Sequence, residues 1–240
     1  MCVKPIRSLL QFATILPMGR QVDLGDFARH SYLYPVAGYV IGGIVGFVVY
    51  WVNPSPVAAA LAVAGVLLLS GAHHFDGLLD LGDGLMAHGT RDKRIAALTD
   101  RQVGAGGIAL GGTVLLLTYA GLQSSPYLAW AVLVGEVGAK FSMAFLTTYG
   151  APFNDGIHSF LFRQSRWYFP AISAALVVPL VLVPVPRLAL AGAGAAMILV
   201  PLALLSISRR CFGGVNGDVV GASNELSRAA IVLAIALAVS

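Results

Sequence analysis

The chain has 240 residues, of which 58% are hydrophobic and only 11% are charged, and its mean hydropathy is +0.82. A soluble domain usually carries about 25% charged residues, so this composition excludes a soluble globular protein. Continuous apolar stretches near 20 residues recur, which is typical of spanning helices and not of the alternating strands of a barrel. We predict an all-α integral membrane protein built as a single transmembrane domain over residues 1–240.

The N-terminal segment 1–17 has the spacing of an amphipathic helix. Its apolar residues near one helical face are Ile6, Leu9, Leu10, Ala13 and Leu16. Such a helix is typical of a segment lying in the membrane interface. The alternative, a secretory signal peptide, needs a longer apolar stretch and a small-residue cleavage site. We therefore predict an N-terminal interfacial helix.

About seven transmembrane helices follow in chain order. They are predicted over residues 33–52, 56–72, 104–122, 127–149, 168–185, 188–206 and 222–239. Proline-containing segments at 54–56, 124–126 and 184–186 separate three hairpins, because proline cannot continue a helix and disfavours helix in the residue before it.

The basic residues predict the orientation of the chain. Thirteen of the fifteen fall on one side of the predicted spans; Arg187 falls on the other side and Lys140 lies within a span. The positive-inside rule makes the first side cytoplasmic, so the N-terminus is inside. This explains the net charge of +4 without a nucleic-acid partner. Cys2 and Cys211 have no metal-binding spacing and are expected to be free thiols.

Three acidic residues stand out between the second and third spans. Asp76, Asp80 and Asp83 are spaced i, i+4, i+7, which places them within roughly 60° of one another on a helix. Their mutual repulsion would be relieved by a cation, and oxygen ligands without cysteine suit Mg²⁺ or Mn²⁺. The alternative is a solvated polar helix end. Asp100 is a candidate fourth ligand, or it caps the third span or pairs with Arg101.

Glycines and a histidine accompany these acids. Gly77, Gly82 and Gly84 weaken a helix by about 1 kcal/mol each, which indicates that something bulky approaches the backbone. His73 shares the face of the acids, with either a substrate-binding or a structural role, whereas His74 points away.

Basic residues follow the acids along the chain. Arg91, Arg94 and Arg101 share a stripe if their segment is helical, and beside a metal site such cations are typical phosphate clamps. The alternative is that they serve only the positive-inside rule. Together with the acids they predict an active-site segment over about 73–107 on the cytoplasmic side, for metal-dependent phosphoryl transfer.

A second polar segment, about 209–225, is predicted on the same side. Its glycine-rich turn suits phosphate binding, with Asp218, Asn224 and Glu225 as candidate substrate contacts. The alternative is a loop that caps the last span through Asp218 and Asn224.

Intramembrane charges add two further candidates. Glu136 and Lys140 lie i, i+4 inside the fourth span, where charged residues are rare and usually functional. They either brace the bundle as a pair, or Lys140 reaches a substrate phosphate. No spacing assigns a role to His158.

The sequence resembles the cobalamin synthase family, adenosylcobinamide-GDP ribazoletransferase, in three blocks that occur in order. The first block is Tyr34-Pro35, Gly38 and Gly42; the second is His74, Asp76-Gly77-Leu78, Asp80, Asp83-Gly84, Arg91 to Arg94, Asp100, Gly104 and Gly107; the third is Gly213-Gly214, Gly217-Asp218, Gly221-Ala222 and Asn224-Glu225. The third block departs from the family pattern at Asn216, where threonine is expected.

The resemblance implies an enzyme of the cell membrane with a cytoplasmic active site. Its substrates are adenosylcobinamide-GDP and α-ribazole or α-ribazole 5′-phosphate, its products are adenosylcobalamin or its 5′-phosphate and GMP, and it requires Mg²⁺. Asp76, Asp80, Asp83 and Asp100 are then expected to hold the metal. Asp83 is the candidate base, because it ends the acidic stripe. A homo-oligomer is left open.

Two rival functions fit the sequence less well. A CDP-alcohol phosphotransferase making phospholipid needs Ala-Arg after the first Asp-Gly pair, but Leu78-Leu79-Asp80 follows Gly77. A cation-coupled transporter would more often place its acids mid-span and show repeated halves.

Overall fold

The computed structural model describes residues 3–52 and 55–239, so Cys2 and Pro54 lie outside the described part. The described chain is helical. Its α-helices are α1 (Val3–Ala13), α2 (Leu24–Ala28), α3 (Tyr34–Tyr50), α4 (Pro56–Leu69), α5 (His73–Met86), α6 (Arg91–Leu98), α7 (Ala105–Gln123), α8 (Leu128–Tyr149), α9 (Ile157–Gln164), α10 (Phe169–Val177), α11 (Arg187–Cys211) and α12 (Gly217–Leu237). Two 3₁₀ turns, η1 (Ser31–Leu33) and η2 (Val178–Leu182), precede α3 and extend α10.

Five helices are long and apolar enough to cross a membrane on their own: α3 with its preceding turn, α7, α8, α11 and α12. We treat these five as the membrane-spanning segments. The predicted spans 56–72 and 168–185 correspond to α4 and to α10 with η2, which are shorter. Each of these meets a second short helix, α5 or α9, at a bend of 94° or 95°; counting each bent pair as one span gives seven.

The bend between α4 and α5 has a local cause. Gly71 and Ala72 both adopt left-handed backbone conformations, with φ of 63° and 57°. Two successive left-handed residues cannot continue a right-handed helix, so α4 ends at Leu69 and α5 starts in a new direction. At its other end, α4 begins with Pro56, and the Ser55 hydroxyl accepts a hydrogen bond from the backbone of Ala58.

Small residues bring the two central helices together. Gly38, Gly42 and Gly46 are spaced four apart on α3 and face α8, and a Cβ added to Gly38 would lie 2.7 Å from the carbonyl oxygen of Glu136. Spacing of this kind lets helix backbones approach closely in membranes. The first family-like block therefore has a packing function.

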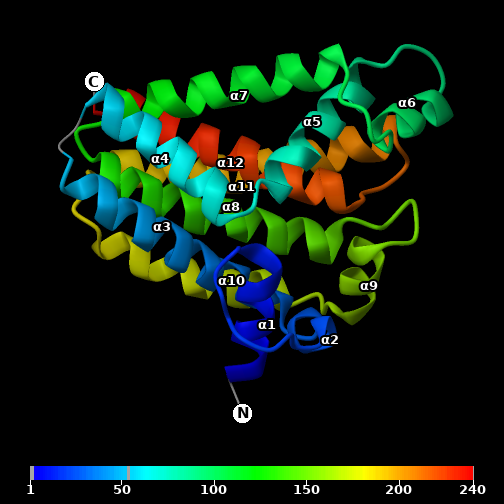
Figure 1. The fold of residues 1–240 in the computed structure, drawn as a ribbon, viewed down its shortest axis with the longest axis horizontal. Helices are drawn as coiled ribbons and strands as arrows, with labels where there is room; N and C mark the ends of the chain where they lie inside the picture. The colour runs from blue at the N-terminus through cyan, green and yellow to red at the C-terminus, as the bar shows by residue number, and fades with distance from the viewer. Residues whose placement is uncertain (1–2, 53–54, 240) are drawn as a thin grey trace.

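The spanning helices run side by side with their loops gathered at two ends (Figure 1). The C-terminus and the links α3–α4 and α7–α8 lie at one end, and α6 and α9 lie at the other. Helix α8 packs against α3, α11 and α12, and α5 packs against α12 and α7. The acidic helix is thus held inside the bundle rather than laid on it.

Helix α1 confirms the predicted N-terminal helix. Its apolar face packs on the protein itself: Leu9, Leu10 and Ala13 are buried in the core cluster that includes Phe27 and Tyr34. The predicted location in the membrane interface and the N-inside orientation stay predictions.

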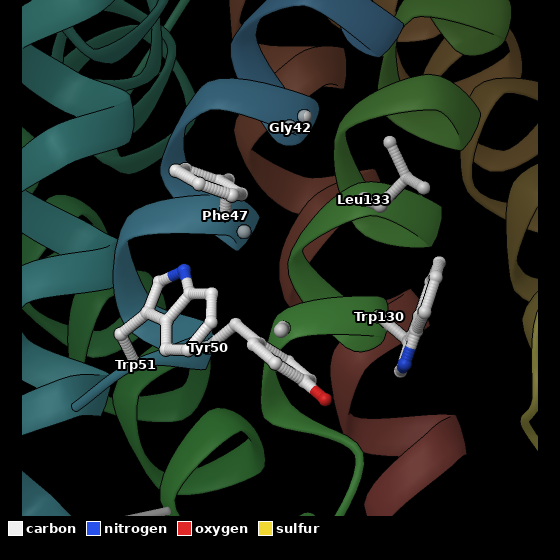
Figure 2. A pocket seen from close by; sticks show the side chains of 9 residues that line it. Gly42, Phe47, Tyr50, Trp51, Trp130 and Leu133 are labelled. Carbon is white, nitrogen blue, oxygen red and sulfur yellow. The ribbon is translucent and has the colours of Figure 1, made fainter. Parts of the chain in front are cut away.

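An apolar groove of about 310 Å³ lies between α3 and α8, towards the end of the bundle that holds the α3–α4 link. Figure 2 shows Phe47, Tyr50 and Trp51 from α3 and Trp130 and Leu133 from α8 around it. The groove has no acidic or basic side chain in its lining, so it offers neither a metal ligand nor a phosphate clamp.

Candidate active site

The glycines of α5 allow it to pack closely against both α12 and α7. A Cβ added to Gly77 would lie 2.6 Å from the carbonyl oxygen of Asp218, at the start of α12, and one added to Gly82 would lie 2.7 Å from that of Gly106 in α7. The predicted close approach to the backbone is confirmed, and the approaching groups are neighbouring helices. This packing fixes which acidic side chains can meet.

A hollow of about 390 Å³ collects carboxylates from three segments that are distant in the chain. It is lined by Asp76 and Asp80 from α5, by Thr99, Asp100, Arg101 and Val103 from the link that follows α6, and by Asp218 from the first turn of α12. We call it the carboxylate hollow. Three of the four predicted metal ligands line it, and Asp218, predicted as a substrate contact, joins them.

The electrostatics of the hollow are dominated by like charges. Asp76 and Asp100 are exposed, whereas Asp80 is half-buried. Burial, followed by the negative charges of Asp218, Asp76 and Asp83, raises the pKa of Asp80 to about 7. Asp80 lies on α5, outside the five spanning helices. Crowded carboxylates of this kind are stabilised by a nearby cation, such as a metal ion or the Arg101 guanidinium.

The donors of the hollow fit a hard cation by chemistry. All are oxygens, without sulfur or imidazole, which is the ligand set that Mg²⁺ and Mn²⁺ take. In the described residues, however, no three His, Cys, Asp or Glu side chains converge closely enough to form a ready-made metal site. A bound cation would have to draw the carboxylates together.

Asp83 is turned away from the hollow and holds the start of α7. Its Oδ2 accepts a hydrogen bond from the backbone nitrogen of Gly104 at 2.7 Å, and its Oδ1 accepts one from Gly107 at 2.8 Å. These are amides at a helix start that lack partners within the helix. Asp83 thus caps the start of α7, which is one of the roles predicted for Asp100. Because both oxygens are engaged, the geometry favours this role over that of general base.

The predicted phosphate clamps separate in space. Helix α6 ends at Leu98, so Arg101 is not on it, and of the three arginines Arg101 is the one that lines the hollow. Arg94 donates a 2.7 Å hydrogen bond to the carbonyl oxygen of Leu85, at the end of α5. Arg91 lies against the turn at Gly213. Arg94 therefore anchors α5, and Arg101 is the cation placed to meet a phosphate.

The last polar segment is mostly helix rather than loop. Helix α12 begins at Gly217, five residues before the predicted span, because the Asn216 side chain caps it by accepting a hydrogen bond from Val219. The predicted caps, Asp218 and Asn224, are therefore wrong. The predicted loop 209–225 is a loop only over 212–216, between α11 and α12.

The intramembrane charges form one buried network. Glu136 and Lys140 of α8 are fully buried beside Glu225 and Arg228 of α12. Arg228 donates to Glu136 at 2.8 Å and also to Glu225, and Lys140 lies 3.7 Å from Glu136 and donates to Asn224 at 2.7 Å. The network contains two cationic and two anionic side chains, so its formal net charge is zero.

This network bears on five assignments made from the sequence. Arg228 was counted among the cytoplasmic loop residues and instead lies inside α12. The brace between Glu136 and Lys140 is present and larger than predicted. Lys140, Asn224 and Glu225 have no exposed surface, so their predicted contacts with substrate stay predictions.

A separate cavity of about 430 Å³ lies on the other side of Asp218. Three histidines line it: His73 and His74 from the first turn of α5 and His158 from α9. Its other lining residues are Gln11, Phe12, Tyr34, Met143, Thr147, Ile157, Leu161, Gly217, Asp218, Val220 and Gly221. We call it the histidine cavity. It was not predicted, because its residues come from six helices with no common spacing.

The fold and site define a helical multi-pass membrane protein with a carboxylate-lined site at one end of its bundle. A family model described as cobalamin-5-phosphate synthase matches residues 5–236. The chain belongs to the cobalamin-5-phosphate synthase family. It is a transferase of cobalamin biosynthesis, so the transporter alternative is not supported.

Similar proteins agree with this assignment. An adenosylcobinamide-GDP ribazoletransferase of Archaeoglobus fulgidus is 35% identical over 98% of each chain. Enzymes of the same name from Methanocella arvoryzae and Methanococcoides burtonii are 36% and 30% identical, over 94% and 98% of this chain and 92% of each relative. No solved structure matches the chain.

Proposed function

We propose that the protein is an adenosylcobinamide-GDP ribazoletransferase. A hydroxyl of α-ribazole, or of its 5′-phosphate, attacks the phosphorus next to the cobinamide. A new P–O bond forms, the bond to GMP breaks, and the hydroxyl proton is lost. The products are adenosylcobalamin, or its 5′-phosphate, and GMP. The printed names of the relatives and the family support this substrate pair.

The observation that carries the proposal is the carboxylate hollow itself. Four carboxylates from three segments surround a space that also contains Arg101. A cluster of this kind repels an anion such as a diphosphate unless cations intervene. Its chemistry therefore fits a metal-assisted reaction at a diphosphate better than hydrolysis by an acid–base pair.

Asp76, Asp80 and Asp100 would hold Mg²⁺, with Mn²⁺ as the alternative. When bound, the metal would neutralise the diphosphate and the leaving GMP. The Arg101 guanidinium would bind a phosphate oxygen and orient the diphosphate towards the acids. Asp83 would contribute indirectly, by fixing the junction of α5 and α7 on which the hollow is built.

The residue that takes the proton of the attacking hydroxyl is best sought at the rim of the hollow. Asp218 is the one carboxylate in the described residues that lines both the hollow and the histidine cavity. It is better placed than Asp83 to meet an acceptor that arrives from outside the hollow. Its side chain accepts a 2.6 Å hydrogen bond from Asn216, which orients it.

The proposed location is the cell membrane, with the hollow facing the cytoplasm. The support is that α6, α9 and the charged segments 91–101 and 155–166 gather at the end of the bundle where the hollow lies (Figure 1). A nucleotide substrate is made and kept in the cytoplasm, so this orientation brings enzyme and substrate together.

A single-turnover assay tests the proposal. Purified protein in detergent is mixed with adenosylcobinamide-GDP, with and without α-ribazole and with and without Mg²⁺, and GMP release is followed. We expect GMP only when both α-ribazole and the metal are present, and a loss of at least 100-fold in Asp80→Asn. Asp92→Asn, an exposed acid on α6, is the matched control. Folded wild-type protein that releases no GMP would refute the function.

A further inference from the structure

We propose that the histidine cavity is the subsite for the acceptor nucleoside. This inference rests on the proposed function and adds to it where the second substrate binds. The class of ligand is a planar heteroaromatic base carrying a sugar with free hydroxyls. Of the predicted site residues, only His73 and Asp218 line this cavity.

Unsatisfied polar atoms indicate that the cavity is built for a ligand. Buried polar atoms in proteins are nearly always hydrogen-bonded, and each exception needs an explanation. The Nδ1 atoms of His74 and His158 are buried without a partner, although the two side chains are more than nine-tenths buried. Both residues line the cavity, and a ligand there that reaches these atoms would supply the missing partners.

The tautomer of His158 indicates what kind of partner is missing. Its Nε2 lies 2.8 Å from the carbonyl oxygen of Gly150, which only accepts hydrogen bonds, so Nε2 carries the proton. Burial lowers the pKa of His158, which favours the neutral ring. In the neutral ring Nδ1 is then an acceptor. The Nδ1 atom therefore lacks a hydrogen-bond donor, and a ribose hydroxyl is such a donor.

The rest of the lining suits a flat aromatic ring. Phe12, Met143, Leu161 and Val220 provide apolar surface, while the imidazoles provide polar edges. Small-molecule sites are usually mostly apolar, with a few placed polar groups, and measure about 300–1,000 Å³. At about 430 Å³ the cavity holds a nucleoside but not a corrin ring with its side arms. We therefore place the other substrate, adenosylcobinamide-GDP, in the open carboxylate hollow.

The position of the cavity connects it to the chemistry. Asp218 lines both spaces, and its backbone is in tight contact with Gly77 of α5. A nucleoside in the cavity would present a hydroxyl at Asp218, next to a diphosphate in the hollow. Two substrates would thus meet from opposite sides of one carboxylate, without competing for space.

Two substitutions separate this role from a structural one. His158→Gln keeps a nitrogen that donates to Gly150 but removes the Nδ1 acceptor. Ile157→Trp, at an exposed rim position, narrows the mouth of the cavity. The controls are His88→Gln, an exposed histidine, and Phe160→Trp, on the same helix but outside the cavity lining.

The measurement is the KM for α-ribazole and the KM for adenosylcobinamide-GDP in each variant, in purified full-length protein with Mg²⁺. We expect the α-ribazole KM to rise about tenfold in His158→Gln, the size expected for one lost hydrogen bond, and to rise in Ile157→Trp because the mouth is narrower. The donor KM should be unchanged in both. The controls should match wild type. Thermal unfolding in detergent checks that each variant is folded.

Two results would overturn the inference. If the folded test variants keep the wild-type α-ribazole KM, the acceptor binds elsewhere, while an active wild-type enzyme keeps the proposed function intact. If the donor KM rises and the acceptor KM does not, the cavity serves the donor. Wild-type protein inactive with every acceptor would instead refute the function on which the inference rests.

Discussion

The carboxylate of Asp83 in α5 is bonded to the start of α7, because its Oδ2 accepts a 2.7 Å hydrogen bond from the backbone nitrogen of Gly104, 21 residues further along the chain. A second bond, from Gly107 to Oδ1, makes the attachment two-pronged. The acidic stripe of α5 therefore has two functions: two of its members face the carboxylate hollow, and the third fixes the helix that borders it.

Removing this attachment should destabilise the protein. Hydrogen bonds to a charged group contribute about 1.5–3 kcal/mol each, so Asp83→Ala should lower the free energy of unfolding by about 3 kcal/mol. Denaturant titration in detergent measures the change. Asp92→Ala, on exposed α6, should stay within about 1 kcal/mol of wild type. A fully stable but inactive Asp83→Ala variant would favour the catalytic role first predicted.

The contact between α5 and α12 leaves no room for a side chain at Gly77. In Gly77→Ala the new Cβ would meet the carbonyl oxygen of Asp218 at 2.6 Å, so α12 must shift and carry Asp218 with it. We expect a loss of stability of about 1–3 kcal/mol and a larger loss of turnover. Gly112→Ala faces open space and should be neutral, or stabilising by up to about 1 kcal/mol. Equal behaviour of the two variants would contradict the packing argument.

The buried network should respond non-additively to substitution. Glu136→Gln leaves the two cations, Arg228 and Lys140, with the single carboxylate of Glu225. Removing one partner of a buried ion pair lowers the free energy of unfolding by about 3–5 kcal/mol. Adding Lys140→Met removes the excess charge and should recover part of that loss. A double-mutant cycle, measured by unfolding in detergent, gives the coupling. Additive losses would show that the two side chains act independently.

The orientation of the chain is open to a direct test. In a background with Cys2→Ser and Cys211→Ser, single cysteines are placed at Lys93 in α6 and at Ser124 in the α7–α8 link. Both positions are exposed and lie at opposite ends of the bundle. An impermeant thiol reagent added to intact cells should label Ser124→Cys and spare Lys93→Cys. The reverse pattern would place the hollow outside the cytoplasm.

Much of the fold could be predicted from the sequence, because spanning helices depend on length and composition, which a single chain displays. The boundaries near 72 and 222 failed for local reasons. Ala72 adopts a left-handed conformation that its side chain does not signal, and the cap of α12 is Asn216, a residue at which the family pattern differs.

Helical spacing predicts which candidate residues share a face of one helix. It does not predict which residues of different helices meet. Helical spacing indicated Asp76 and Asp80, but it also grouped Asp83 with them, because spacing does not show which neighbour a side chain contacts. The place of Asp218 in the carboxylate hollow depends on the Gly77 contact, and the histidine cavity depends on six helices. Such contacts exist only after the bundle has formed.

The short length of α4 has a consequence for the surrounding lipid. Its 14 residues rise about 21 Å, less than the roughly 30 Å of a bilayer's hydrocarbon core. Because α5 leaves α4 at a bend of 94°, its first turn adds little to this length, so the lipid beside α4 must thin. The polar first turn of α5 then lies near the boundary between the hydrocarbon core and water, where a bulky substrate with amide side arms and a soluble nucleoside can both arrive.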